Sequence, residues 1–272
     1  MPLAKADGAN IYYEVIGQGD PLVLIQGYGH HLLHWGALPR EFVKIGYQVV
    51  LLDNRGVGRS DKPDAPVTIA TMADDVCKVM DAAGIRRAAV FGISMGGMIA
   101  QVFAFNHADR LNALVLGCTT PCGAHHVPPD PEGMRILFDF EYLKNMTPEQ
   151  RSRTVFSFFC SEEYIQANPD ALKYYHMVTM QYPTPTSTFA QQAEAISKED
   201  TWDRLPGIKA PTMIISGTAD RIMSFKNSEL LEQRIPGAEL VLLQDKQHGF
   251  FIEAMDSTRI FVNGFLKRKA KK

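Results

Sequence analysis

The chain lacks the features that would assign it to a membrane, to nucleic acid or to a disulfide-rich class. Four cysteines among 272 residues are too few for a disulfide framework. No run approaches the roughly 18 uninterrupted apolar residues of a membrane helix. The formal net charge of −2 would gather neither nucleic acid nor an anionic membrane. The first residues show no apolar signal core, so we expect a cytoplasmic protein with reduced thiols.

What the chain does have is an alternation of short apolar runs with helix-like segments. The alternation fills the first 120 residues and resumes after residue 206. Its order predicts a parallel sheet with helices on both faces. The expected strands are residues 10–16, 21–26, 47–52, 88–93, 111–117, 212–216 and 238–243, and the expected helices are residues 38–45, 69–83, 95–105, 224–234 and 257–267.

The middle of the chain has a different pattern. Residues 121–205 contain proline breaks and helix-like pieces but no buried-strand signal, which predicts a helical insertion into a core of residues 1–120 and 206–272. Eleven aromatic residues lie between positions 138 and 189. A small helical insert cannot bury that many on itself, so we expect some of them to line an apolar cavity against the core.

Residues 92–97 read Gly-Ile-Ser-Met-Gly-Gly and match the G-x-S-x-G pattern of a nucleophile elbow. The motif lies between an expected buried strand and an expected helix, as an elbow must. A direct strand-to-helix turn strains the serine backbone and points its hydroxyl outward, so the neighbouring residues must be very small. We therefore predict that Ser94 is the catalytic nucleophile; the alternative is a glycine-rich turn with an incidental serine.

A serine hydroxyl needs an adjacent base, and histidine suits the task because its pKa lies near neutrality. His248 is the histidine that follows the last expected strand, and the order Ser, Asp, His is that of elbow enzymes. Asp220, at the end of the strand at 212–216, is the predicted orienting acid. Asp245 is its rival, but it lies only three residues before His248. The alternatives are a surface histidine and an Asx-turn aspartate.

Acyl transfer also needs two N–H donors for the developing oxyanion. One is the backbone N–H of Met95, the residue after the nucleophile. The other should come from the loop after the strand at 21–26, where residues 26–29 read Gln-Gly-Tyr-Gly. We predict the backbone N–H of Tyr28 as this second donor.

With these motifs in order, the sequence resembles the α/β-hydrolase superfamily along nearly its whole length. The resemblance implies an eight-stranded, mostly parallel sheet with helices on both faces and an inserted helical cap. The elbow is similar to that of carboxylesterases, 3-oxoadipate enol-lactonase-like and aclacinomycin methylesterase-like enzymes, and cofactor-free haloperoxidase-like esterases. Gln26 departs from the histidine of many relatives, and a serine nucleophile argues against epoxide hydrolases and haloalkane dehalogenases. The matching segments are residues 26–29, 53–60, 92–97, 217–221 and 248–249.

The predicted function is a serine hydrolase that cleaves a carboxylic ester of a small, mainly apolar substrate. Alternatives within enzymes are a lactonase, a thioesterase and a carbon–carbon bond hydrolase; from another class, a ligand-binding receptor that retains the triad. We expect no cofactor, no metal, no nucleic acid and no membrane partner, and leave the oligomeric state open, a homo-oligomer included. Residues 53–60 are interpreted as a structural turn. Two groups with metal-binding side chains are interpreted as loop and pocket residues: His30, His31 and His34, and Cys118, Cys122, His125 and His126.

Overall fold

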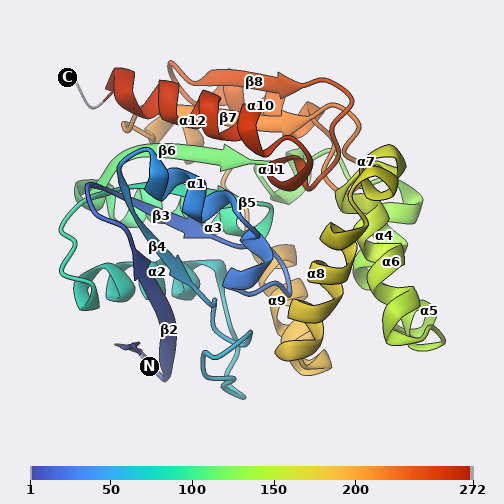
Figure 1. The fold of residues 1–272 in the computed structure, drawn as a ribbon. Helices are drawn as coiled ribbons and strands as arrows, with labels where there is room; N and C mark the ends of the chain where they lie inside the picture. Colours follow the sequence, from blue (N-terminus) through green and yellow to red (C-terminus); the bar gives the residue numbers. More distant parts are fainter. Residues whose placement is uncertain (1, 270–272) are drawn as a thin grey trace.

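The computed structural model describes residues 2–269, which are built around one eight-stranded sheet (Figure 1). The strand order is β1-β2-β4-β3-β5-β6-β7-β8, with β1/β2 and β2/β4 antiparallel and the other neighbours parallel. This confirms the mostly parallel α/β sheet. The strands are β1 (Leu3–Ala6), β2 (Ala9–Ile16), β3 (Asp20–Ile25), β4 (Tyr47–Leu52), β5 (Ala88–Ile93), β6 (Leu111–Gly117), β7 (Thr212–Gly217) and β8 (Glu239–Leu243).

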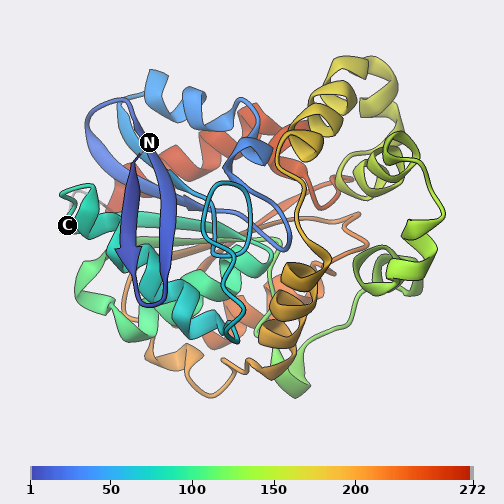
Figure 2. The ribbon, with the colours of Figure 1, turned by 90° about the horizontal axis from the view of Figure 1, so that it is seen from below.

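Helices cover both faces of the sheet (Figures 1 and 2). Alternate residues of one strand belong to different core clusters: Leu22 lies in the cluster that contains residues of α1 and α12, and Val23 in the cluster that contains residues of α2, α3 and α10. Both side chains are fully buried, which explains why the strand is a continuous apolar run. These helices are α1 (Leu38–Lys44), α2 (Ile69–Ala82), α3 (Met95–Asn106), α10 (Lys226–Arg234) and α12 (Met255–Lys269).

Among the strands, β1 is the one to which the sequence pattern assigned no residues. It has four residues and pairs with β2 at the sheet edge. Ala4 is buried but Leu3 is half exposed, so its apolar signal is weak. The last helix also begins earlier than expected, at Met255, and follows the short helix α11 (Phe250–Glu253). The short 3₁₀ turns are η1 (Leu32–Trp35), η2 (Ala108–Arg110), η3 (Gly123–His125) and η4 (Leu205–Gly207).

Residues 121–205, called the insert below, form helices beyond the carboxyl ends of β6 and β8 (Figure 1). Proline opens several of them, because its fixed φ and missing N–H suit the first helical turn. The division into a core and a separate cap domain stays a prediction. The helices of the insert are α4 (Pro131–Phe138), α5 (Phe140–Lys144), α6 (Pro148–Phe159), α7 (Glu162–Ala167), α8 (Pro169–Gln181) and α9 (Thr186–Lys198).

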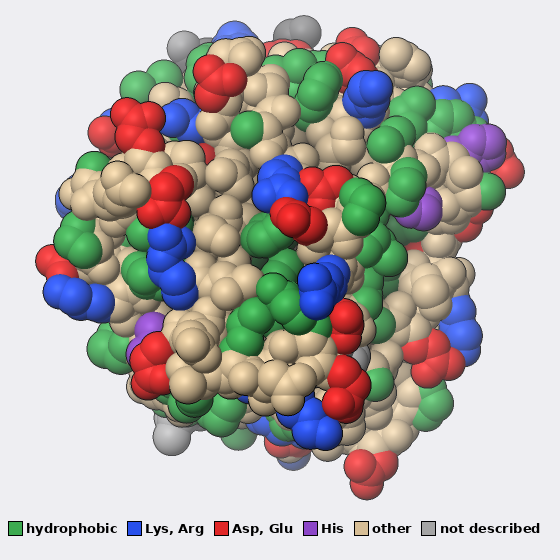
Figure 3. All heavy atoms as spheres, turned by 90° about the vertical axis from the view of Figure 1, so that its right-hand side faces the viewer, with side chains coloured by type: hydrophobic (Ala, Val, Ile, Leu, Met, Phe, Trp, Pro, Cys, Tyr) green, Lys and Arg blue, Asp and Glu red, His purple; other side chains and the backbone are tan. Residues whose placement is uncertain are grey.

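The outer surface is mixed in character. Figure 3 faces the side on which the insert lies and shows hydrophobic side chains interspersed with charged ones. Among the side chains whose exposure the structure describes, the large hydrophobic ones that the insert exposes are Met134, Tyr174, Met177 and Met180. Within residues 2–269, no helix combines the length and the apolar character needed to cross a bilayer.

Candidate active site

Ser94 occupies a sharp turn between β5 and α3. Its backbone has φ 54° and ψ −125°, in the positive-φ region that non-glycine residues rarely adopt. A Cβ on Gly92 would lie 2.1 Å from the carbonyl oxygen of Gly96, and one on Gly96 would lie 2.2 Å from that of Ile25. Both glycines are therefore required by close backbone passage. The side of the turn that carries Ser94 is partly open to solvent, whereas Met95 is buried.

Asp220 and His248 meet at the same edge of the sheet. The Nδ1 of His248 lies 2.7 Å from Oδ2 of Asp220, and both side chains are buried. The other carboxylate oxygen accepts hydrogen bonds from the backbone N–H groups of Ile222 (2.8 Å) and Met223 (2.7 Å). With Nδ1 bonded to Asp220, Nε2 is the ring nitrogen that can accept a proton.

The electrostatics of this pair favour the charged imidazole. Burial lowers the pKa of His248, but the adjacent Asp220 carboxylate and, after it, the Cys118 sulfur outweigh burial and raise the pKa well above the ordinary value for histidine. The buried carboxylate therefore both orients the ring and stabilises an imidazolium.

Asp245, the rival acid, does not share this geometry. It is exposed, and its carboxylate accepts a hydrogen bond from the side chain of Gln244 at 3.0 Å. Its backbone is in the positive-φ region at 57°. The structure therefore directs Asp245 outward and Asp220 toward the imidazole.

Cys118 adjoins these residues, although we did not predict it among them. It follows β6 directly, is fully buried and has a φ of 36°. The ligand atoms of Cys118, Asp220 and His248 all lie within 4.8 Å of one another. Burial raises the pKa of the Cys118 thiol, while the His248 imidazole and the backbone of Ser94 act in the opposite direction. The thiol is thus a neighbour common to Ser94 and His248.

The signal that could have found Cys118 is its position in the chain. Residues at the carboxyl ends of adjacent parallel strands meet at one sheet edge, and β6 lies between β5 and β7. Ser94 follows β5, and Asp220 lies in the loop after β7. A side chain directly after β6 therefore had to lie between them.

The loop that contains Tyr28 passes directly beside Ser94. A Cβ on Gly27 would lie 3.0 Å from Cβ of Ser94 and 3.5 Å from its Oγ. Within residues 2–269, the backbone N–H groups of Tyr28 and Met95 donate no hydrogen bond to another residue. Met95 is the first residue of α3, where N–H groups lack partners within the helix, so both N–H groups are free to bind a group held beside Ser94.

The insert holds this loop from outside. The Tyr28 hydroxyl donates to the carbonyl of Phe189 (3.0 Å), and the N–H of Gly29 donates to Oε1 of Gln192 (2.9 Å). The hydroxyl of Thr184 donates to the carbonyl of Gly29 (2.8 Å). A Cβ on Gly29 would lie only 2.1 Å from the ring of Phe189. Helix α9 and the segment before it therefore set the position of the loop, a role that sequence reasoning did not assign to Gln192.

His30, His31 and His34 join the core to helix α8. Neighbouring rings lie 4.2–4.3 Å apart, and burial lowers the pKa of all three, to about 4 for His30. They serve as docking residues, and within the described part of the chain their ligand atoms form no metal-holding cluster. Their Nε2 atoms contact the Tyr175 hydroxyl (3.1 Å), the Val178 carbonyl (3.0 Å) and the Thr179 hydroxyl (3.1 Å), respectively.

The second group with metal-binding side chains does not come together. His125 is exposed and stacks on Trp202 with ring centroids 4.3 Å apart. Cys122 is buried, and its thiol contacts the carbonyl of Thr120. Cys118 lies instead beside His248, so the spacing of these residues in the sequence does not reflect a shared site.

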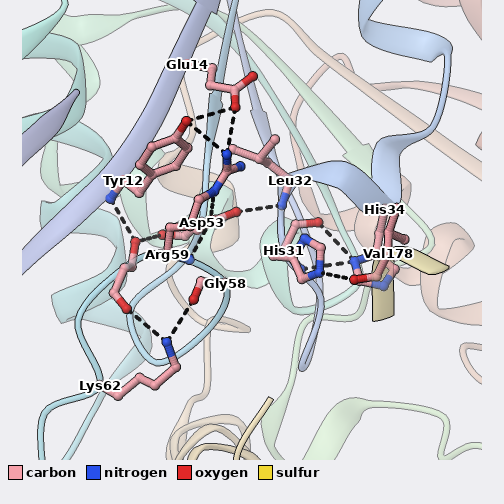
Figure 4. A network of polar contacts seen from close by, with 11 residues as sticks. Tyr12, Glu14, His31, Leu32, His34, Asp53, Gly58, Arg59, Lys62 and Val178 are labelled. Carbon is pink, nitrogen blue, oxygen red and sulfur yellow. Dashed lines mark hydrogen bonds and ion pairs between the residues drawn. The ribbon is translucent and has the colours of Figure 1, made fainter. Parts of the chain in front are cut away.

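A buried aspartate braces the segment that carries the histidines (Figure 4). One oxygen of Asp53 accepts the N–H of Leu32 and the other accepts the N–H of Arg59, each at 2.8 Å. Arg59 also bonds to Glu14 on β2 at 3.1 Å. These contacts agree with the interpretation of residues 53–60 as a structural turn.

Aromatic side chains of the insert border these residues. The rings of Phe138 and Phe189 lie 5.8 and 5.2 Å from that of Tyr28, and the ring of Phe159 lies 5.3 Å from that of His248. Their contacts with core residues agree with the expectation that the insert cannot bury all its aromatics on itself. The apolar cavity itself stays a prediction.

The sheet order and the strained serine turn define a class of proteins, the hydrolases of the α/β type. The chain belongs to the alpha/beta hydrolase fold family, whose model matches residues 20–254.

Named relatives cover almost the whole chain. A putative carbamate hydrolase of Azorhizobium caulinodans is 28% identical over 270 residues, which are 97% of this chain and 98% of that protein. A 2-hydroxy-6-oxo-6-phenylhexa-2,4-dienoate hydrolase of Comamonas testosteroni is 29% identical over 274 residues, 95% and 92% of the two chains. The crystal structure of an enol-lactonase from Burkholderia xenovorans is similar with a TM-score of 0.84 and 28% identity, over 98% of this chain and all of the other. The chain is a hydrolase of this fold.

Proposed function

We propose that this hydrolase cleaves a carboxylic ester of a small, mainly apolar substrate, with Ser94 as nucleophile, His248 as base and Asp220 as orienting acid. The observation that carries the proposal is the 2.7 Å contact between His248 and Asp220 at the sheet edge that also bears the strained Ser94 turn. The free N–H groups of Tyr28 and Met95 beside that turn support it further.

The reaction proceeds in two halves. His248 removes the hydroxyl proton of Ser94, which attacks the ester carbonyl, and the N–H groups of Tyr28 and Met95 bind the oxyanion. The imidazolium, stabilised by Asp220, returns the proton to the leaving alcohol. Water then attacks the acyl-enzyme by the same route and restores the serine.

The substrate class rests on the insert and on the comparisons. The rings of Phe138, Phe159 and Phe189 favour an apolar acyl or alcohol group. A lactone is a cyclic carboxylic ester, so the likeness to an enol-lactonase supports the same bond type and makes a lactone the second candidate. We further propose a cytoplasmic location, in line with the sequence, and a small-molecule substrate as the partner; formation of a homo-oligomer stays open.

The test compares Ser94→Ala with the unchanged protein on chromogenic esters, lactones, thioesters and diketones. We expect ester turnover with an initial acyl burst, and a loss of at least about 10⁴-fold in Ser94→Ala. Ser197→Ala is the matched control, since Ser197 is exposed on α9 and its hydroxyl bonds to the carbonyl of Glu194 within the same helix.

Three outcomes would contradict the proposal. A burst that persists in Ser94→Ala would exclude this serine as the nucleophile. Tight binding of an ester with negligible turnover would favour a receptor that retains the three side chains, and turnover confined to diketones would favour carbon–carbon bond hydrolysis.

A further inference from the structure

The Cys118 thiol takes no part in the mechanism proposed above, yet it lies against two of its side chains. Its Sγ, a carboxylate oxygen of Asp220 and a ring nitrogen of His248 lie within 4.8 Å of one another, and all three residues are buried. The backbone of Cys118 also has a φ of 36°, in the positive-φ region that is rare for residues other than glycine. A strained, buried thiol beside an imidazole and a carboxylate needs an explanation of its own.

We propose that Cys118, Asp220 and His248 form an inhibitory site for a soft or borderline divalent cation such as Zn²⁺ or Cd²⁺. Thiolate, imidazole and carboxylate are the ligands that these ions take from proteins. Two of the residues belong to the proposed triad, and Cys118 adds the sulfur that selects such ions over Mg²⁺ or Ca²⁺.

Charge balance favours a divalent ion. A buried site tolerates little net charge. A cation of charge +2 with one thiolate, one carboxylate and a neutral imidazole sums to zero. The thiol has a raised pKa because burial disfavours the isolated thiolate, and the cation removes that penalty by replacing the thiol proton.

The distances require a modest rearrangement. Zinc–ligand bonds of about 2.0–2.3 Å in a tetrahedron place the ligand atoms roughly 3.3–3.8 Å apart. The 2.7 Å separation of His248 Nδ1 and Asp220 Oδ2 would therefore have to widen by about 0.6 Å, with loss of their hydrogen bond, and the widest separation of up to 4.8 Å would have to shrink by about 1 Å. Both changes are within reach of the Cys118 and His248 side-chain rotations. A fourth position is left for water.

Binding involves proton release and no redox step. The cation displaces the thiol proton, and a second proton when His248 is charged, so affinity rises with pH. A neutral imidazole has a single lone pair. Once that lone pair binds the cation, His248 cannot accept the proton of Ser94, and hydrolysis stops. This inhibition, unlike the binding, rests on the proposed function.

The binding test uses the full chain and Cd²⁺, whose bond to a thiolate gives an ultraviolet charge-transfer band. We expect a band that saturates at one Cd²⁺ per chain, disappears in Cys118→Ser and persists in Cys77→Ser and Cys160→Ser. Cys160 is the matched control because it is another buried cysteine, and Cys77 is a half-buried one. A band that survives in Cys118→Ser would overturn the site.

The inhibition test measures ester turnover against Zn²⁺ with and without a chelator. We expect reversible inhibition whose half-maximal concentration rises at least tenfold in Cys118→Ser. Inhibition unchanged by that substitution would overturn the inhibitory role.

Two further measurements distinguish failure of the proposed cation site from failure of the proposed esterase function or of a variant to fold. The Cd²⁺ band is recorded without substrate, so it tests the site even when no ester is turned over. If Cys118→Ser and Cys118→Ala fail to fold, X-ray absorption at the cadmium edge of the unchanged protein decides: one sulfur ligand supports the site, and only nitrogen and oxygen ligands overturn it.

Discussion

The two sides of the candidate site are held by different parts of the molecule. Asp220 and His248 lie on loops that follow β7 and β8, and these loops bond to each other: the N–H of Ala219 donates to the carbonyl of Lys246 at 2.9 Å. The first half of the insert also bonds to them: the N–H of Asp130 donates to the carbonyl of Arg221 at 3.2 Å, and the carbonyl of Phe159 accepts the N–H of Gly249. The Tyr28 loop is bonded instead by the second half of the insert, that is, by α8, α9 and the segment between them.

The two sides also differ in the protonation of their histidines. The Asp220 carboxylate raises the pKa of His248, whereas burial lowers the pKa of His30, His31 and His34, and at His31 it outweighs the Asp53 carboxylate. We therefore propose that the loops at the sheet edge set the acid–base chemistry and that α8 and α9 set the position of the proposed oxyanion donors. Substitutions on the two sides should therefore differ in how much they lower kcat, in whether they alter KM and in how their effects depend on pH.

The largest effect should come from the acid–base side. Asp220→Asn keeps the shape of the side chain but loses the charge that orients and stabilises the imidazolium, so we expect kcat to fall by about 10⁴-fold. Steady-state ester hydrolysis measures this. Asp245→Asn is the control, and an equal loss in that variant would mean that the wrong carboxylate has been assigned.

On the oxyanion side we expect a smaller loss. Gln192→Ala removes the acceptor of the Gly29 N–H without touching a reacting group, so kcat should fall roughly tenfold, less than the about 10²–10³ for deletion of a direct donor. KM should change little. Gln191→Ala is the matched control, because Gln191 bonds to the carbonyl of Pro63 and not to the Tyr28 loop. A change confined to KM would show that Gln192 only shapes substrate binding.

The pH dependence of activity should report His248. The base must be neutral to act, and its pKa is raised in the folded protein, so kcat/KM should rise about tenfold per pH unit up to a pKa above 6.5. In Asp220→Asn the midpoint should move down, because burial then acts without the carboxylate. A midpoint that stays in place would argue that another group titrates.

The pH dependence of stability should report the histidines of the other side, whose pKa values are shifted in the opposite direction from that of His248. Their pKa is lowered on folding, so the unfolded chain binds more protons and stability falls as pH drops below 6.5, toward about 4 for His30. The slope is at most about 1.4 kcal/mol per pH unit for each histidine. Thermal unfolding of His31→Gln, compared with the unchanged chain, measures this; an unchanged slope would contradict it.

The sequence contains enough local information for the sheet and for the strained serine turn. The apolar runs of β3 to β7 are buried on both faces, and the glycines at 92 and 96 are required within a few residues of Ser94. Strand β1 carries too few apolar side chains for such a pattern. A local sequence pattern therefore predicts the strands with a continuous apolar run and misses β1, which has none.

The contacts between the insert and the Tyr28 loop could not be predicted in this way. Gly29 and Gln192 are 163 positions apart, and the acceptor of His31 is a backbone carbonyl that any residue at 178 would supply. Cys118 was predictable from strand order alone, but its proximity to His248 depends on a backbone conformation that no propensity favours. Long-range hydrogen bonds therefore cannot be predicted from the sequence when one partner is a backbone group.

The ring of Phe189 seated on Gly29 has a consequence for engineering. Even a methyl group at position 29 would meet that ring, and the positive φ of 67° there already disfavours any side chain. Grafting the helical segment of another hydrolase onto this scaffold would therefore succeed only when the graft presents an equally shaped ring, or a gap, at that point. The segment is not an interchangeable module, and a chimaera should be designed from residue 29 outward.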